Sequence, residues 1–173
     1  MIEKLLFFAK IQCGYAVQRG VELVECHFAH TASDAVMILR MEGIVFMGDV
    51  LFVNRHPWLG DGDPDSLKKH LQRFYGNELL KQFIPGHGNV AGRESLGVLI
   101  QHITDRQKMA LDAIANGEAD SLFVRKPISS QYKSWWFGRF YRDNLATVYE
   151  KAKDKKWAHL YYLSVMHWNL FRF

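Results

Sequence analysis

The sequence has 173 residues, of which 49% are hydrophobic and 14% aromatic. This length is about that of one average domain and the composition suffices for a packed core, which excludes a disordered or fibrous chain. The net charge of +4 is modest, and it comes from residues 105–173, which hold 12 Lys and Arg against 7 Asp and Glu. Residues 1–104 hold 10 basic and 11 acidic residues and are nearly neutral.

The sequence favours a cytoplasmic protein with reduced thiols. The first ten residues, MIEKLLFFAK, contain an apolar run of only about five residues, shorter than a signal peptide needs. No stretch approaches the roughly 18 apolar residues of a membrane span, so no membrane partner is expected. Cys13 and Cys26 lack the spacing of a disulfide framework or of a cysteine zinc site. We expect Cys26 to be a small buried hydrophobic residue.

Three strands are expected first. Residues 21–30 alternate apolar and polar side chains after Gly20, as a half-buried strand does. Residues 35–41 and 44–52 are continuous apolar runs. Because only Glu42 and Gly43 separate them, they predict a tight hairpin between two buried strands.

Two helices and a short strand are expected next. Residues 63–75 start with acidic side chains and then carry Leu67, Leu71 and Phe74 at helical spacing. This pattern predicts a helix that begins near Asp63. Residues 81–85 predict a short strand, and a long helix is expected from Ser95 to about Asn116, ended by Gly117.

The remaining residues combine basic and aromatic side chains. Segment 120–133 is expected to be irregular, and a last helix is expected over 134–153. That helix begins with Trp135, Trp136, Phe137, Arg139, Phe140, Tyr141 and Arg142. Cations with stacking faces can bind single-stranded nucleic acid. We expect instead an amphipathic helix that packs its rings on the core, and no nucleic-acid partner. Residues 157–173 are apolar enough to pack on the domain or to form a partner surface.

Three candidate metal ligands stand where expected strands end and loops begin: His30, Asp49 and His87. Imidazole and carboxylate groups together suit zinc, iron or manganese. The glycines of the GD and PGHG segments let the backbone approach a bound ion closely. Taken singly, each of these side chains is more often a hydrogen-bonded structural residue. The ordered set is therefore the more informative observation.

The set resembles the third, fourth and fifth motifs of the metallo-β-lactamase superfamily, with AHTASD at 29–34, FMGDVLF at 46–52 and IPGHG at 84–88. The resemblance covers about residues 20–104 and implies an α/β fold: half of an αββα sandwich, with a mixed sheet covered by helices. By this resemblance residues 1–104 form the C-terminal half of the family's domain. Residues 105–173 form a helical, aromatic-rich extension that packs on it.

The resemblance also implies roles for the site residues. His30 would bind the first metal, Asp49 would bridge both, and His87 would bind the second, with zinc expected and iron or manganese as alternatives. Asp49 would be the catalytic residue because it orients the metal-bound hydroxide. We expect Asp34 to hold the His30 loop by accepting hydrogen bonds from backbone N–H groups.

The family's HxHxDH motif is missing, since His27 is the only histidine before His30. Each metal would have one histidine and a share of Asp49, fewer than the three protein ligands of a catalytic zinc site. We therefore expect a metal-dependent hydrolase of a small-molecule ester, thioester, phosphoester or amide that is truncated and inactive or weakly active alone. An N-terminal half-domain or a second copy would be its partner, on an apolar sheet face. The alternative is a degenerate family member that acts as a binding or interaction module.

The other histidines have no ligand-like spacing and are expected to be structural: His56, His70, His102, His159 and His167. Of these, we expect only His56 near the site, as a residue on the rim of its cleft.

Overall fold

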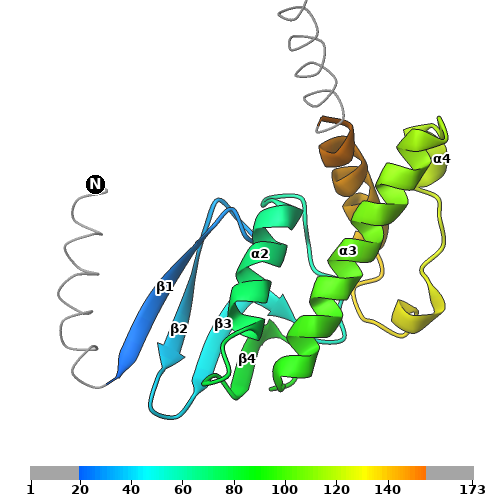
Figure 1. Cartoon of the computed structure of the whole chain (residues 1–173). Helices are drawn as coiled ribbons and strands as arrows, with labels where there is room; N and C mark the ends of the chain where they lie inside the picture. The colour runs from blue at the N-terminus through cyan, green and yellow to red at the C-terminus, as the bar shows by residue number, and fades with distance from the viewer. Residues whose placement is uncertain (1–19, 155–173) are drawn as a thin grey trace, which may run out of the picture.

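The computed structural model describes residues 20–154, which form a mixed four-stranded sheet with helices on one face (Figure 1). The strands β1 (Val21–His27), β2 (Ser33–Leu39) and β3 (Ile44–Phe52) are antiparallel neighbours. Strand β4 (Gln82–His87) pairs with β3 in parallel. The expected α/β class with a mixed sheet covered by helices is confirmed.

The predicted turn between β2 and β3 is confirmed. Gly43 has a φ of 68°, which glycine adopts without steric cost, and its N–H donates to the Leu39 carbonyl at 2.9 Å. The first strand is shorter than predicted and ends at His27. Phe28 adopts a φ of 53° and donates its N–H to Ala32 at 3.1 Å, so the chain turns away before His30.

Both predicted long helices are present. Helix α2 (Pro64–Tyr75) begins where predicted, because the Asp63 carboxylate accepts the N–H groups of Asp65 and Ser66, both at 2.9 Å. Helix α3 (Arg93–Ala115) starts two residues before the predicted Ser95.

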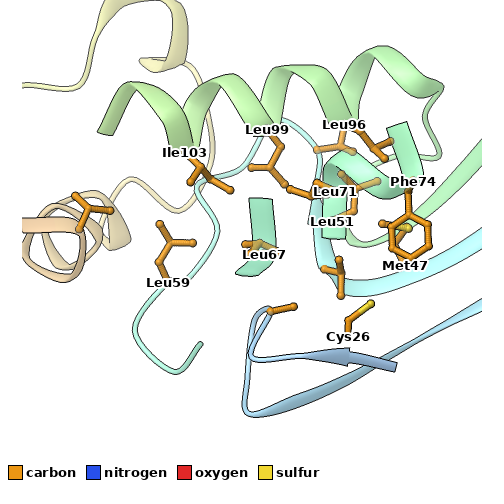
Figure 2. Packing of buried hydrophobic residues seen from close by; sticks show 14 of the residues in the cluster. Cys26, Met47, Leu51, Leu59, Leu67, Leu71, Phe74, Leu96, Leu99 and Ile103 are labelled. Carbon is orange, nitrogen blue, oxygen red and sulfur yellow. The ribbon is translucent and has the colours of Figure 1, made fainter. Parts of the chain in front are cut away.

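The core lies between the sheet and these two helices. Figure 2 shows Leu67 and Leu71 of α2 and Leu99 of α3 close to Leu51 of β3. Cys26 is fully buried at the sheet, and burial raises the pKa of its thiol to about 11, which confirms that it behaves as a hydrophobic residue.

The opposite face of the sheet is also apolar. One row of side chains crosses all four strands, because Leu23 pairs with Met37, Met37 with Phe46, and Phe46 with Ile84. Leu23 keeps 47% of its surface accessible, and Met37, Phe46 and Ile84 are half-buried. The apolar sheet face expected from the sequence is therefore present.

The last helix of the described residues starts later than predicted. A single turn α4 (Asp120–Phe123) and a 3₁₀ turn (Ser130–Tyr132) precede a helix over 140–154. The prediction of a helix from residue 134 is wrong because Trp136 forms a β-bridge with Arg55, which requires extended backbone there.

Some predictions fall outside the described residues. These include the packing of residues 157–173 and the roles of Cys13, His159 and His167. Within residues 20–154, no helix has the length and apolar character needed to cross a membrane.

Asn144 joins the last helix to the loop that follows β3. This side chain is 1% exposed, and its amide donates to the Pro57 carbonyl at 2.6 Å and accepts from the Leu59 N–H at 3.0 Å. The amide thus satisfies two buried backbone groups more than 80 residues away in the sequence.

The substitution Asn144→Ala should lower the free energy of unfolding by roughly 2 to 4 kcal/mol, because two buried peptide groups lose their partners. Urea denaturation followed by circular dichroism measures this change. The exposed Asn116→Ala is the matched control and should change stability by less than about 0.5 kcal/mol. Equal stabilities of the two variants would contradict a joining role for Asn144.

Candidate metal centre

The structure brings the three predicted ligands to one edge of the sheet. His30 lies in the loop between β1 and β2, Asp49 lies on β3, and His87 is the last residue of β4. Because β3 and β4 run in parallel and pair at Phe52 and His87, the end of β4 is held beside the part of β3 that follows Asp49.

The Asp49 carboxylate lies between the two imidazoles. Its Oδ1 is 3.4 Å from Nε2 of His87, and its Oδ2 is 3.9 Å from Nε2 of His30. One carboxylate oxygen therefore faces each histidine. Imidazole nitrogen and carboxylate oxygen are both donor atoms that zinc accepts in proteins.

Two phenylalanines that the sequence analysis did not single out support the histidines. The Phe52 ring stacks on His87 with centroids 4.9 Å apart and is tilted against His30 at 5.5 Å. The Phe137 ring meets His87 edge-on at 5.5 Å. Phe52 was recognisable only as the last residue of an apolar run, and nothing local connects Phe137 with a residue 50 positions earlier.

Gly86 is required for the position of the Asp49 carboxylate. A Cβ atom added to Gly86 would lie 2.2 Å from Oδ1 of Asp49 and 2.8 Å from the carbonyl carbon of Gly48. The Asp49 side chain and the β3 backbone at Gly48 therefore leave no room for a side chain at residue 86. The glycine of the PGHG segment therefore allows β4 to approach the carboxylate.

Asp34 holds the His30 loop, which confirms its predicted role. Its Oδ2 accepts the backbone N–H groups of His30 and Thr31, both at 2.9 Å. Its Oδ1 accepts the Thr31 hydroxyl at 3.0 Å. These hydrogen bonds fix the backbone at the ligand itself, so the His30 side chain is presented from a rigid turn.

The loops around the site contain strained backbone. Phe28, Asn54 and Phe137 are the only non-glycine residues with positive φ between residues 20 and 154, with values of 53°, 55° and 63°. Phe28 lies in the His30 loop, Asn54 follows β3, and Phe137 contacts His87. Such strain costs free energy and concentrates at functional sites, which supports a function for this edge of the sheet.

The donor set is incomplete for a catalytic metal ion. In the part of the chain that the structure describes, no group of three or more His, Cys, Asp and Glu side chains is arranged to hold a metal. The two histidines and one carboxylate face one another, and Nδ1 of His30 is buried without a hydrogen-bond partner. The residues present in the described part of the chain therefore do not fit a complete metal centre.

The expectation that His56 lies on the rim of the site is wrong. His56 is fully buried, and its ring lies 5.3 Å from that of His102 on α3, which is also fully buried. Arg106, one turn further along α3, is buried beneath the rings of Tyr132 and Tyr141. The histidines thus belong to the contact between α3 and the extension.

This cluster keeps both histidines neutral. Burial and, second, the nearby Arg106 charge lower the pKa of His56 from its ordinary value of 6.5 to about 4. Burial and then Arg106 lower the pKa of His102 to about 2. Both ring nitrogens of His102 lack a hydrogen-bond partner in the described part of the chain.

A search of solved structures finds similarity to metallo-β-lactamases. One is the metallo-β-lactamase FIM-1 from Pseudomonas aeruginosa in its mono-zinc form, with 29% identity and a TM-score of 0.42 over 49% of this chain and 39% of that chain. A metallo-β-lactamase from Pontibacter korlensis has 24% identity and a TM-score of 0.44 over 49% of this chain and 41% of that chain. One from Erythrobacter litoralis has 19% identity and a TM-score of 0.43 over 49% and 39%.

No family model matches the sequence, and no curated protein matches it. The chain spans about two fifths of the length of the solved structures that it matches. These structures are metallo-β-lactamases, the superfamily that the motifs resemble, and the similarity extends over about half of this chain.

The substitution Asp34→Ala should lower the free energy of unfolding by roughly 2 to 3 kcal/mol, because two backbone N–H groups and one hydroxyl lose a charged acceptor. Thermal or urea denaturation measures the loss. The exposed Asp112→Ala is the control and should stay within about 0.5 kcal/mol of the wild type. An unchanged stability of Asp34→Ala would mean that the His30 loop is held by other contacts.

The His56 and His102 cluster should make the protein less stable in acid. Both histidines have folded-state pKa values below the ordinary 6.5, so the unfolded chain binds protons that the folded chain excludes. The free energy of unfolding should therefore be independent of these groups above about pH 7 and should fall between pH 6.5 and pH 4. Urea denaturation at several pH values tests this.

The double variant His56→Gln, His102→Gln should lose most of this pH dependence. The exposed His27→Gln should keep it, because His27 is outside the cluster and pairs with Glu25 at 3.2 Å. A slope that persists in the double variant would assign the acid sensitivity to other groups.

Proposed function

We propose that this chain provides half of the metal centre of a metallo-β-lactamase-type hydrolase. His30 is a ligand of the first metal, His87 is a ligand of the second, and Asp49 is the catalytic carboxylate shared by both. The observation that carries the proposal is the position of Asp49, with one carboxylate oxygen 3.4 Å from His87 and the other 3.9 Å from His30.

Zinc is the metal that we propose, because imidazole nitrogen and carboxylate oxygen are among its usual protein ligands. Iron or manganese would accept the same donors. The proposed reaction is hydrolysis of an ester, thioester, phosphoester or amide bond in a small molecule. The geometry of the half-site does not select among these bonds, because scaffolds of one fold support many chemistries.

The missing ligands would come from a polypeptide half that bears an HxHxDH motif. The apolar row of Leu23, Met37, Phe46 and Ile84 offers the surface on which it would pack, since this face lies opposite the helices and keeps partial exposure. A half-domain that buries this row would gain roughly 25 cal/mol for each Å² of apolar surface. A second copy of the chain could cover the same face but would bring no HxHxDH ligands.

We place the protein in the cytoplasm, where Cys26 remains a buried thiol. Alone, the chain is inactive or weakly active in this proposal.

The second candidate function is a binding module without catalysis. The absence of a group of three metal-binding side chains among residues 20–154 favours it. Three observations favour half of a hydrolase instead. The two histidines face Asp49, Gly86 makes room for the Asp49 carboxylate, and Asp34 holds the backbone at His30 by a hydrogen bond.

Elemental analysis of the purified chain, alone and mixed with a separately expressed half that bears HxHxDH, tests the proposal. We expect little zinc in the isolated chain and near-stoichiometric zinc in the mixture. In the mixture, His30→Ala, Asp49→Ala and His87→Ala should each lower the zinc content at least about tenfold at limiting metal, because each removes a direct ligand.

The matched control is His27→Ala, an exposed histidine three positions before His30 whose ring pairs with Glu25. It should leave zinc uptake unchanged. Stoichiometric zinc in the isolated chain would contradict the half-site, and full zinc uptake by all three ligand variants would mean that the site is wrongly assigned. No zinc in either sample would favour the binding module.

A further inference from the structure

Arg106 on α3 is a buried positive charge without an anionic partner. The side chain is 1% exposed, and it forms no ion pair with any acidic side chain between residues 20 and 154. Outside that range the sequence has a single acidic residue, Glu3. Burial of a charge costs free energy unless an opposite charge compensates it. The position of Arg106 therefore calls for a counter-ion.

The neighbouring carboxylate of Asp105 does not serve as this counter-ion. Its Oδ2 accepts the Tyr132 hydroxyl at 3.0 Å and the side-chain amide of Gln131 at 3.1 Å. Its Oδ1 accepts the side-chain amide of Gln101 at 2.7 Å. Both oxygens of Asp105 are thus hydrogen-bonded to neutral groups, and the guanidinium of Arg106 lies beyond ion-pair distance.

Several buried nitrogen atoms around this charge have no hydrogen-bond partner in the part of the chain that the structure describes. They are Nε and Nη2 of Arg106 and both ring nitrogens of His102. The remaining guanidinium nitrogen, Nη1, reaches only the His102 carbonyl, at 3.5 Å. The Arg106 Cζ atom lies 4.7 Å from the ring centroid of Tyr132 and 5.1 Å from that of Tyr141. Aromatic faces attract a cation but accept hydrogen bonds weakly, so the N–H groups still need an acceptor.

The side chains around Arg106 form a closed circuit of contacts. The Tyr132 ring meets His102 with centroids 4.6 Å apart, and His102 meets His56 at 5.3 Å. The His56 ring then meets Tyr141 at 5.6 Å. Since Tyr132 and Tyr141 both contact Arg106, the circuit closes on the guanidinium. Each of the five side chains is at most 3% exposed, so bulk water does not neutralise the charge.

We propose that this cluster binds one halide ion, chloride in the cell, beside the Arg106 guanidinium. A monovalent anion balances the single buried charge. It accepts hydrogen bonds from Nε and Nη2 of Arg106 and from the one N–H group that a neutral His102 ring carries. A halide suits the cluster better than a larger oxyanion, because aromatic rings surround the guanidinium and leave almost no exposed surface.

The ion joins three segments of the chain. His56 belongs to the loop after β3, Arg106 and His102 belong to α3, and the two tyrosines belong to the extension. Halide binding therefore stabilises the contact between the extension and the rest of the fold. This inference is independent of the proposed function, because none of the candidate metal ligands belongs to the cluster.

Urea denaturation of the full chain at neutral pH, in mixtures of sodium chloride and sodium gluconate at constant ionic strength, tests the proposal. Gluconate is too large to enter the cluster. Once chloride exceeds its dissociation constant, a tenfold rise in chloride should lower the unfolding equilibrium constant about tenfold, because the folded chain holds one ion that the unfolded chain releases.

The variant Arg106→Met replaces the charge by an apolar side chain, and its unfolding constant should change less than about twofold over the same chloride range. The matched control is Arg73→Met, an exposed arginine in the last turn of α2, which should keep the full chloride dependence. A wild type that does not respond to chloride, or an undiminished response in Arg106→Met, would overturn the proposal.

A second measurement uses the wild type alone and decides the question even if Arg106→Met does not fold. The chain is refolded and crystallised in sodium bromide, and the anomalous scattering of bromine locates the ion. We expect one bromide peak in contact with the Arg106 guanidinium. A water molecule at this position, or bromide only at the protein surface, would show that no halide site exists in the cluster.

Discussion

The candidate site depends on the parallel pairing of β3 and β4. This pairing places His87 beside Phe52 and brings the backbone at Gly86 against the Asp49 carboxylate, where any side chain would collide with it. The carboxylate is then fixed between the imidazoles of His87 and His30. Without this close approach the three side chains would be separate structural residues at strand ends.

The extension stabilises the same edge of the sheet from the other side. The Asn144 side chain forms hydrogen bonds with the backbone of Pro57 and Leu59 in the loop after β3. In the same region the neutral His56 of this loop packs against His102 of α3. The aromatic segment that the sequence analysis expected to pack on the core contacts the candidate site through the Phe137 ring, which meets His87.

The candidate site has fewer metal-ligating side chains than a complete metal centre needs. The two histidines and the carboxylate lie in contact with one another, unlike unrelated polar residues at strand ends. They supply fewer ligands for each metal ion than the three that a catalytic zinc site has. The apolar face of the sheet is also incompletely covered. Its side chains pair across four strands, but they stay partly exposed. Both features are explained if a second half completes the ligands and covers the face.

Local sequence determined the hairpin at Gly43, the start of α2 at Asp63 and the Asp34 clasp on the His30 loop, because each depends on residues within a few positions of one another. The ordered motifs also singled out His30, Asp49 and His87, which the structure brings together. Only the tertiary structure decided that Trp136 pairs with Arg55 and that His56 is buried against His102, since these contacts join segments 46 to 81 residues apart. Helical periodicity in the tail could not reveal its extended start, because a hydrogen-bonding partner far away in the sequence outweighs local propensity.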